Sequence, residues 1–301
     1  MDDDPTSLHA TARTPLGDVG VHVWPALDAH GAALDDGAAA ALGRPGAGRR
    51  PVLVALHGWT DGGVVFGPLA AALGRRWTVI GIDAGGHGRT PWPARGQSGS
   101  RYVVADSAAQ AAAVVDALPE VAGRRAPVVV LGHSMGAVSA ARVAAALPDL
   151  VVHAVLEDPP RTTARAVRNA SRWRRSLATL QQLTHDERVA LSRTQNPQWD
   201  DADHQAWAAS KAEVDPAHLR VPIEWGEPLV ALLADVTVPV TFIHGRRERG
   251  SIVTSAAAAR CARACRAGCE VVQLDAGHCV FRDARAPYVA VLASVLSRYE
   301  R

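Results

Sequence analysis

Short apolar runs alternate with helix-length segments along this chain, and this alternation limits the fold more than any other feature of the sequence. The runs are PVLVALHG (51–58), WTVIGID (77–83), PVVVLG (127–132) and VVHAVLE (151–157), and each ends at a glycine or a polar residue. Uninterrupted apolar runs of this length are typical of strands buried on both faces. Strands that alternate with helices form parallel βαβ units. The sequence therefore predicts an α/β fold with a mostly parallel central sheet flanked by helices.

The pattern changes between residues 159 and 234. This segment holds four of the eight tryptophans and no strand-like run, and helical stretches such as SRWRRSLATLQQL fill it. Strand-like runs resume at 236–245 and 269–278. We therefore predict a core domain made of residues 1–158 and 235–301, into which residues 159–234 are inserted as a helical cap.

One strand leads directly into a serine. In VVVLGHSMGA (128–137), Ser134 stands between Gly132 and Gly136, with an apolar strand before it and an Ala-rich helix after it. A Gly-x-Ser-x-Gly turn in this setting lifts the serine out of a tight strand-to-helix bend. Reactive groups gather beyond the carboxyl ends of parallel strands, so this is where a nucleophile is expected. A serine hydroxyl also needs a base, and the base needs a third group to hold it.

Four features follow one another along the chain. They are His57-Gly58-Trp59 after the first central strand, the run from Asp83 to Gly88, the Gly132–Gly136 turn, and Gly277-His278 after the last strand. In this order they resemble the α/β-hydrolases with a helical cap, of the esterase and lactonase kind. The resemblance extends from about residue 15 to the end of the chain, and order and spacing together make it specific. The resemblance implies the α/β-hydrolase fold.

The resemblance also implies roles for individual residues. Ser134 would be the nucleophile and His278 the general base, which suits an imidazole because it titrates near neutral pH. The backbone N–H groups of Trp59 and Met135 would form the oxyanion hole. His57 and His87 are expected to organise loops rather than to transfer protons. The remaining histidines of ordinary setting are expected to be surface or cap residues: His153, His185, His204 and His218.

Two residues remain candidates for the acid that orients His278. Asp158 follows the strand after the serine turn, and we favour it. Glu248 follows the next strand, and it stands among Arg246, Arg247 and Arg249, as in an exposed ion cluster. Glu248 stays the alternative acid.

The substrate pocket is expected to be apolar, because large apolar sites favour large apolar ligands. Its predicted lining consists of Trp59, His133, Trp173, Trp199 and Trp207. Arginines at 161, 165, 168, 172, 174 and 175 either receive an anionic substrate group or form the solvated face of a helix.

A serine at the turn argues against the dehalogenases and epoxide hydrolases of this fold, which resemble it but use aspartate there. The interpretation we favour is a serine hydrolase that cleaves a carboxylic ester or lactone of a bulky, mainly apolar small molecule, with no metal and no organic cofactor. The alternatives are a serine-triad enzyme of another type, namely a C–C bond hydrolase, a hydroxynitrile lyase or a cofactor-free perhydrolase, and a slow-turnover small-molecule binding protein.

Composition excludes other classes. The net charge of +2 leaves no basic face for nucleic acid, and nearly all positive charge is arginine, since Lys211 is the only lysine. No run reaches the roughly 18 apolar residues of a membrane helix, and MDDDPTSLHA lacks the apolar segment of a secretory signal. We therefore expect a cytoplasmic protein. The cysteines at 261, 265, 269 and 279 lack metal-site spacing and are expected to be reduced thiols. The sequence gives no prediction for the oligomeric state.

Overall fold

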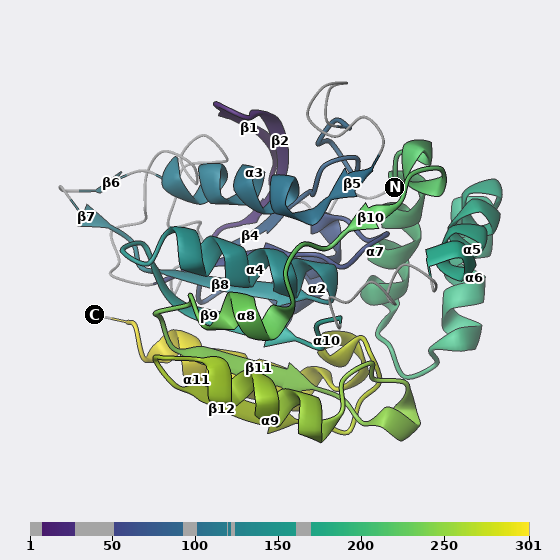
Figure 1. Cartoon of the computed structure of the whole chain (residues 1–301). Helices are drawn as coiled ribbons and strands as arrows, with labels where there is room; N and C mark the ends of the chain where they lie inside the picture. The colour runs from purple at the N-terminus through teal and green to yellow at the C-terminus, as the bar shows by residue number, and fades with distance from the viewer. Residues whose placement is uncertain are drawn as a thin grey trace.

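An eight-stranded sheet forms the centre of the protein (Figure 1). The computed structural model describes residues 8–27, 51–92, 101–118, 120–121, 124–160 and 170–300. In spatial order the strands are β1 (Leu8–Thr14), β2 (Gly17–Trp24), β4 (Val79–Ile82), β3 (Val52–Leu56), β8 (Val128–His133), β9 (Val151–Glu157), β11 (Val240–His244) and β12 (Cys269–Gln273). From β4 to β12 all neighbours are parallel, while β1 and β2 are antiparallel to their neighbours. The predicted mostly parallel sheet is confirmed.

Helices cover both faces of the sheet, so the strands are buried on both sides. In β3, Leu53 and Ala55 face one core, whereas Val54 and Leu56 face the other, as expected from the alternation of side chains along a strand. One face packs against α3 (Val104–Asp116), α4 (Met135–Ala146), α8 (Leu229–Leu233) and α9 (Ser255–Ala264). The other packs against η1 (Gly63–Phe66), α2 (Gly67–Ala72), α10 (Val280–Asp283) and α11 (Arg285–Ser297).

The alternation of apolar and polar residues in DVGVHVW (18–24) predicts a strand, and this strand is β2; its antiparallel partner β1 was not predicted. The sequence of β1, LHATART, carries little apolar character, and only Ala12 of the strand is buried. An edge strand needs no apolar alternation on its outer side, so no pattern indicated it. The Ala- and Gly-rich sequence that follows β2 predicts a loose surface connection, and its residues 28–50 lie outside the described residues.

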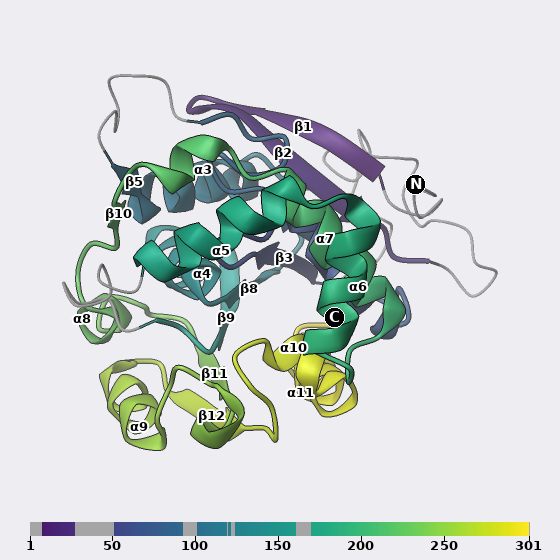
Figure 2. The ribbon, with the colours of Figure 1, turned by 90° about the vertical axis from the view of Figure 1, so that its right-hand side faces the viewer.

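Between β9 and β11 the described residues, 158–160 and 170–239, are mainly helical. Their elements are α5 (Ala170–Gln182), α6 (His185–Gln195), α7 (Asp201–Ala212), η3 (Pro216–Leu219), β10 (Ile223–Glu224) and α8. Figure 2 shows α5, α6 and α7 lying across the carboxyl ends of β3, β8 and β9. The expectation of no strand in this segment is wrong by one short element, because β10 pairs in parallel with β5 (Tyr102–Val103). Two residues are too short to leave a periodic signal.

A capping box fixes the start of α6. The hydroxyl of Thr184 accepts the backbone N–H of Glu187 at 3.3 Å, and the Glu187 carboxylate accepts the N–H of Thr184 at 2.7 Å. Both bonds satisfy groups that a helix start leaves without intrahelical partners. The turn between α5 and α6 is thereby defined.

Three short elements complete the fold of the described residues. They are β6 (Glu120–Val121), its partner β7 (Arg124–Arg125) and η4 (Arg247–Arg249). Of the helices in the described ranges, none combines the length and the apolar character needed to cross a bilayer.

Candidate active site

Ser134 stands at a strained turn between β8 and α4. Its backbone has φ of 53° and ψ of −114°, and its N–H donates to the carbonyl of Glu157 at 2.9 Å. The two flanking glycines allow this turn. A Cβ on Gly132 would lie 2.1 Å from the carbonyl oxygen of Gly136, and a Cβ on Gly136 would lie 2.0 Å from that of Leu56. No larger residue fits at either position, so the glycines hold Ser134 out of the sheet.

His278 connects Ser134 to Asp158. Its Nε2 lies 3.1 Å from Ser134 Oγ and its Nδ1 lies 2.7 Å from Asp158 Oδ2. In the tautomer with the proton on Nδ1, the ring donates to the carboxylate and Nε2 accepts the serine hydroxyl. His278 comes from the loop between β12 and α10, so three separate strand ends contribute to one chain of contacts. These are the contacts that a base needs to activate a serine.

Asp158 is a buried carboxylate with a full set of donors. It follows β9 at φ of 40°, and besides His278 it accepts the hydroxyl of Ser251 at 2.5 Å and the N–H of Ile252 at 2.9 Å. Burial alone would raise the pKa of Asp158, but the His278 contact and the hydrogen bonds from Ser251 and Ile252 outweigh burial and lower that pKa. Asp158 is therefore ionised at neutral pH.

Glu248 is placed differently. It lies in η4, its side chain is 69% exposed, and it pairs with Arg246 at 3.7 Å. None of the three residues of this short helix is buried. The structure brings Asp158, and not Glu248, to His278.

The loop after β3 passes directly beside Ser134. A Cβ on Gly58 would lie 2.9 Å from Cδ2 of His133 and 3.3 Å from Cβ of Ser134. His57 shapes this loop: its Nδ1 bonds the Gly58 carbonyl at 2.8 Å and its Nε2 accepts the N–H of Ala84 at 2.9 Å. Burial lowers the pKa of His57, so the ring is neutral. Its contacts are those of a residue that organises a loop.

Trp59 follows Gly58 in the loop beside Ser134, and Met135 directly follows Ser134 in the chain. Met135 is the first residue of α4 and is buried, so its N–H points from a helix start, where partial positive charge gathers. The indole N–H of Trp59 donates to Nδ1 of His218 at 3.2 Å. His218 is buried, as are His153 and His204. The expectation of surface or cap residues is wrong for His153, which is buried in β9, whereas His204 and His218 do lie in the segment 159–234, although both are buried there.

A cavity of about 1000 Å³ opens in front of Ser134 and His278. Of the predicted lining residues, Trp59, His133, Trp173 and Trp207 line it, and Trp225 lines it too. Trp199 does not line it. Its indole N–H donates to Asp283 at 2.6 Å and its ring lies against the guanidinium of Arg282, so Trp199 supports a lining residue from behind. Arg161, Arg165 and Arg168 lie outside the described residues.

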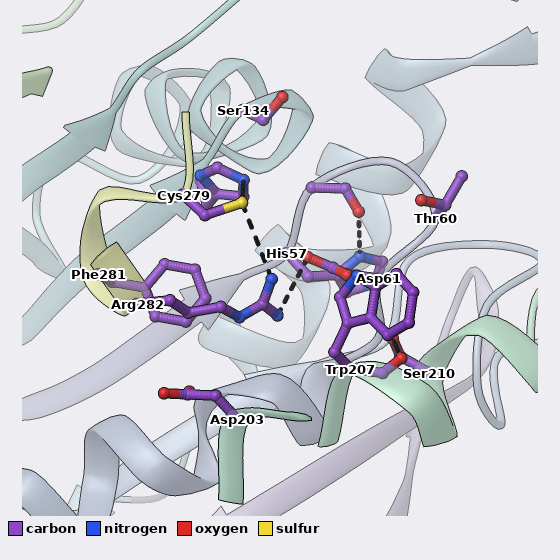
Figure 3. A network of polar contacts seen from close by, with 12 residues as sticks. His57, Thr60, Asp61, Ser134, Asp203, Trp207, Ser210, Cys279, Phe281 and Arg282 are labelled. Atoms are coloured by element: carbon purple, nitrogen blue, oxygen red, sulfur yellow. Dashed lines mark hydrogen bonds and ion pairs between the residues drawn. The ribbon is translucent and has the colours of Figure 1, made fainter. Parts of the chain in front are cut away.

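Sequence reasoning missed four charged residues of the cavity wall, shown in part in Figure 3: Asp61, Lys211, Arg247 and Arg282. Lys211 Nζ donates to the carbonyl of Thr60 at 2.7 Å and pairs with Asp61 Oδ1. Arg282 Nη2 lies 3.4 Å from Asp61 Oδ2. Two features of the sequence could have indicated three of them. Asp61 and Arg282 each stand four residues after a histidine of the family motifs, His57 and His278, and Lys211 is the only lysine of the chain.

The described residues contain no group of three or more His, Cys, Asp and Glu side chains placed to hold a metal ion. The four cysteines are unpaired; Cys261 and Cys265 are buried, and Cys269 and Cys279 are half-buried.

A mostly parallel sheet with a serine raised at the β8–α4 turn, and a histidine from the loop after the last strand, define an α/β-hydrolase. Residues 47–283 match the family described as serine aminopeptidase, S33, and the chain belongs to this family of hydrolases. The predicted fold class is thereby confirmed.

Individual relatives are similar over part of the chain or at low identity. A 2-(acetamidomethylene)succinate hydrolase of Mesorhizobium japonicum is 34% identical over 111 residues, and lipase LipV of Mycobacterium tuberculosis is 35% identical over 107 residues. Each match spans 36% of the relative, about a third of its length, and 37% and 36% of this chain. A crystal structure of E-2-(acetamidomethylene)succinate hydrolase superposes with a TM-score of 0.67 at 22% identity, covering 96% of this chain and 99% of that chain.

Proposed function

We propose that the protein hydrolyses a carboxylic ester or lactone of a bulky, mainly apolar small molecule through an acyl-enzyme. The observation that carries this proposal is the 3.1 Å contact between Ser134 Oγ and His278 Nε2, with Asp158 bound behind the ring. The similarity to a lipase over 107 residues supports an ester substrate.

The residues would act in a simple sequence. Ser134 Oγ attacks the carbonyl carbon while His278 Nε2 takes the hydroxyl proton, and Asp158 stabilises the imidazolium that forms. The backbone N–H groups of Trp59 and Met135 receive the oxyanion. His278 then gives its proton to the leaving alcohol. Water repeats the sequence on the acyl-enzyme, releases the acid and restores Ser134.

The size and walls of the cavity support a bulky substrate. Its volume of about 1000 Å³ is at the upper end for small-molecule sites, and Trp173, Leu177 and Trp225 give it apolar walls. Helix α5 and the segment around β10 supply these three residues. We propose that residues 159–234 act as the cap that selects the substrate.

A second candidate is hydrolysis of a bond other than an ester by the same three residues. The similarity to a 2-(acetamidomethylene)succinate hydrolase over 111 residues favours it. Parallel assays with matched esters and amides separate the two candidates, because the preferred bond will show the higher kcat/KM.

The first test is the intact mass after exposure to a small fluorophosphonate, with Ser134→Ala alongside. We expect one adduct on the wild type and none on the variant, because only an activated serine reacts rapidly with this reagent. Ester hydrolysis should vanish in Ser134→Ala while folding, followed by circular dichroism, is retained. Wild-type-like ester turnover by Ser134→Ala would refute the assignment.

A further inference from the structure

A buried group of charges forms part of the cavity wall. Asp61 lies between Lys211 and Arg282, and the three side chains come from the loop after β3, from α7 and from α10. Asp61 is 5% exposed, and Lys211 and Arg282 are each 3% exposed. Two cations share one carboxylate, so this group, which we call the Asp61 cluster, holds one positive charge in excess.

Two of the neighbouring carboxylates pair with basic side chains of their own, Asp203 with Arg285 at 2.5 Å and Glu157 with His133 at 3.2 Å. Asp283 accepts neutral N–H groups, those of the Trp199 indole and of Gly277, and its carboxylate makes no hydrogen bond or ion pair with Lys211 or Arg282. Charged side chains are seldom buried without full pairing. The excess charge of the Asp61 cluster is therefore a feature that calls for an explanation.

Arg282 makes few hydrogen bonds for a buried guanidinium. Its plane packs against Trp199 and Phe281, with Cζ 4.9 Å and 4.6 Å from the ring centroids. At its edge, Nη2 reaches Asp61 only at 3.4 Å and Nη1 reaches Cys279 Sγ at 3.9 Å, as Figure 3 shows. Nε has no hydrogen-bond partner in the structure. A guanidinium has five N–H donors in a fork that matches a carboxylate, so most of its capacity is unused.

Lys211 is also incompletely compensated. Burial lowers the pKa of its ammonium, the charge of Arg282 lowers it further, and Asp61 offsets these effects only in part. A second anion beside Lys211 and Arg282 would relieve the repulsion between the two cations. The same cavity is lined by Ser134 and His278, so one small molecule can reach both the serine and the Asp61 cluster.

We propose that Lys211 and Arg282 form a subsite for a carboxylate, so that the substrate of Ser134 carries a carboxylate joined to its scissile carbonyl by a short spacer. This inference rests on the proposed function. The spacer is short because Cys279, which follows His278 in the chain, contacts Arg282. A single excess positive charge matches a monoanion, and the fork of Arg282 matches the planar carboxylate. The rest of the ligand meets the apolar walls.

The test compares two esters of equal chain length. In p-nitrophenyl pentanoate the five-carbon acyl chain ends in a methyl group, and in mono-p-nitrophenyl glutarate it ends in a carboxylate. We expect the wild type to have a kcat/KM about tenfold or more higher for the glutarate ester, the effect of one or two charge-assisted hydrogen bonds. Arg282→Gln and Lys211→Met should bring the ratio close to one, mainly through KM.

In each of the two variants Asp61 keeps one cationic partner. Arg282→Gln leaves Asp61 paired with Lys211, and Lys211→Met leaves Asp61 beside Arg282, so neither strands a buried carboxylate. The matched control is Arg298→Gln, which removes an exposed arginine paired with Glu270 at 3.1 Å and should keep the wild-type ratio. Equal kcat/KM values for the two esters in the wild type, or an unchanged ratio in Arg282→Gln, would overturn the subsite.

Binding to the inactive Ser134→Ala protein separates the subsite from the proposed function. Calorimetry with 4-phenylbutyrate and 4-phenylbutanamide should show tighter binding of the carboxylate, and adding Arg282→Gln should remove the difference. If the fluorophosphonate adduct forms but carboxylate and amide bind equally, the subsite is wrong and the hydrolase proposal stands. If no adduct forms while the Arg282-dependent preference is present, the subsite stands and the proposed function fails.

Discussion

Asp158 Oδ2 lies 2.7 Å from Nδ1 of His278, on the far side of the imidazole from Ser134. The carboxylate is buried and holds two further donors, so the orientation of the ring is fixed from behind. Glu248, by contrast, is mostly exposed. The two acids that the sequence left open therefore differ in burial, in partners and in distance from the base.

Asp158→Asn should lower kcat by about three to four orders of magnitude, because an amide cannot hold the imidazolium or select its tautomer. Glu248→Gln is the matched control and should stay within about twofold of the wild type, as an exposed charge contributes little. Steady-state kinetics with p-nitrophenyl esters measure both. Similar small losses in the two variants would exclude both acids.

The variant Ser251→Ala tests whether the Ser251 hydroxyl stabilises the ionised form of Asp158, through the pH dependence of the free energy of unfolding. The folded pKa of Asp158 is lowered from 3.8, so the stability from its ionised form is complete above 3.8 and is lost as pH falls through the folded pKa. The variant lacks one donor to this carboxylate and should be less stable by about 1–3 kcal/mol at pH 6. That gap should narrow at pH 3, measured by urea unfolding. A gap independent of pH, as expected for the exposed control Ser297→Ala, would contradict this role.

The preference for the glutarate ester should fall at alkaline pH. The pKa of Lys211 is lowered from 10.5, so the ammonium loses its proton, and the subsite its charge, at a lower pH than for an ordinary lysine. The groups that face it are Asp61, Arg282, Cys279, and the rings of His57 and His87. Lys211→Arg should keep the preference to higher pH. Rate ratios corrected for spontaneous hydrolysis provide the measurement, and identical pH profiles would exclude Lys211 as a charge in the subsite.

Asp61→Asn should destabilise the protein, and a carboxylate added to the solution should restore part of the lost stability. Removing this carboxylate strands two buried cations, which costs about 3–5 kcal/mol. Glutarate should restore more stability to the variant than to the wild type, because it replaces the missing charge. Urea unfolding with and without glutarate measures this. Asp116→Asn, at an exposed pair with Arg125, should change stability by less than about 1 kcal/mol and respond to glutarate like the wild type. A response of Asp61→Asn no larger than that would contradict the prediction.

The sheet and the serine turn were predictable because their signals are local. Three of the four apolar runs, those of β3, β8 and β9, end at the site, and Gly132, Ser134 and Gly136 lie within five residues. The conformation of this turn can be inferred from the sequence, because only glycine fits at positions 132 and 136. Strand β1 lacked such a signal because an edge strand needs no apolar pattern.

The Asp61 cluster was not predictable in the same way. Its members are separated by 150 and 71 positions in the chain, and each alone looks like an ordinary charged residue. Burial is what distinguishes them, and burial depends on how α7 packs over the loop after β3. Trp199 illustrates the same limit. Its aromatic side chain suggested a pocket wall, but in the structure its ring packs against Arg282 and does not line the cavity.

The single lysine of the chain has a practical consequence. Its ammonium is enclosed by Asp61 and the Thr60 carbonyl, so an amine-reactive reagent meets no exposed lysine side chain on the folded protein. Lys211 also lines the cavity, so a reagent that enters the cavity acylates it once the ammonium releases Asp61 and the Thr60 carbonyl. The labelling rate at this one position, followed by mass spectrometry, therefore reports how often that contact opens, without any engineered probe.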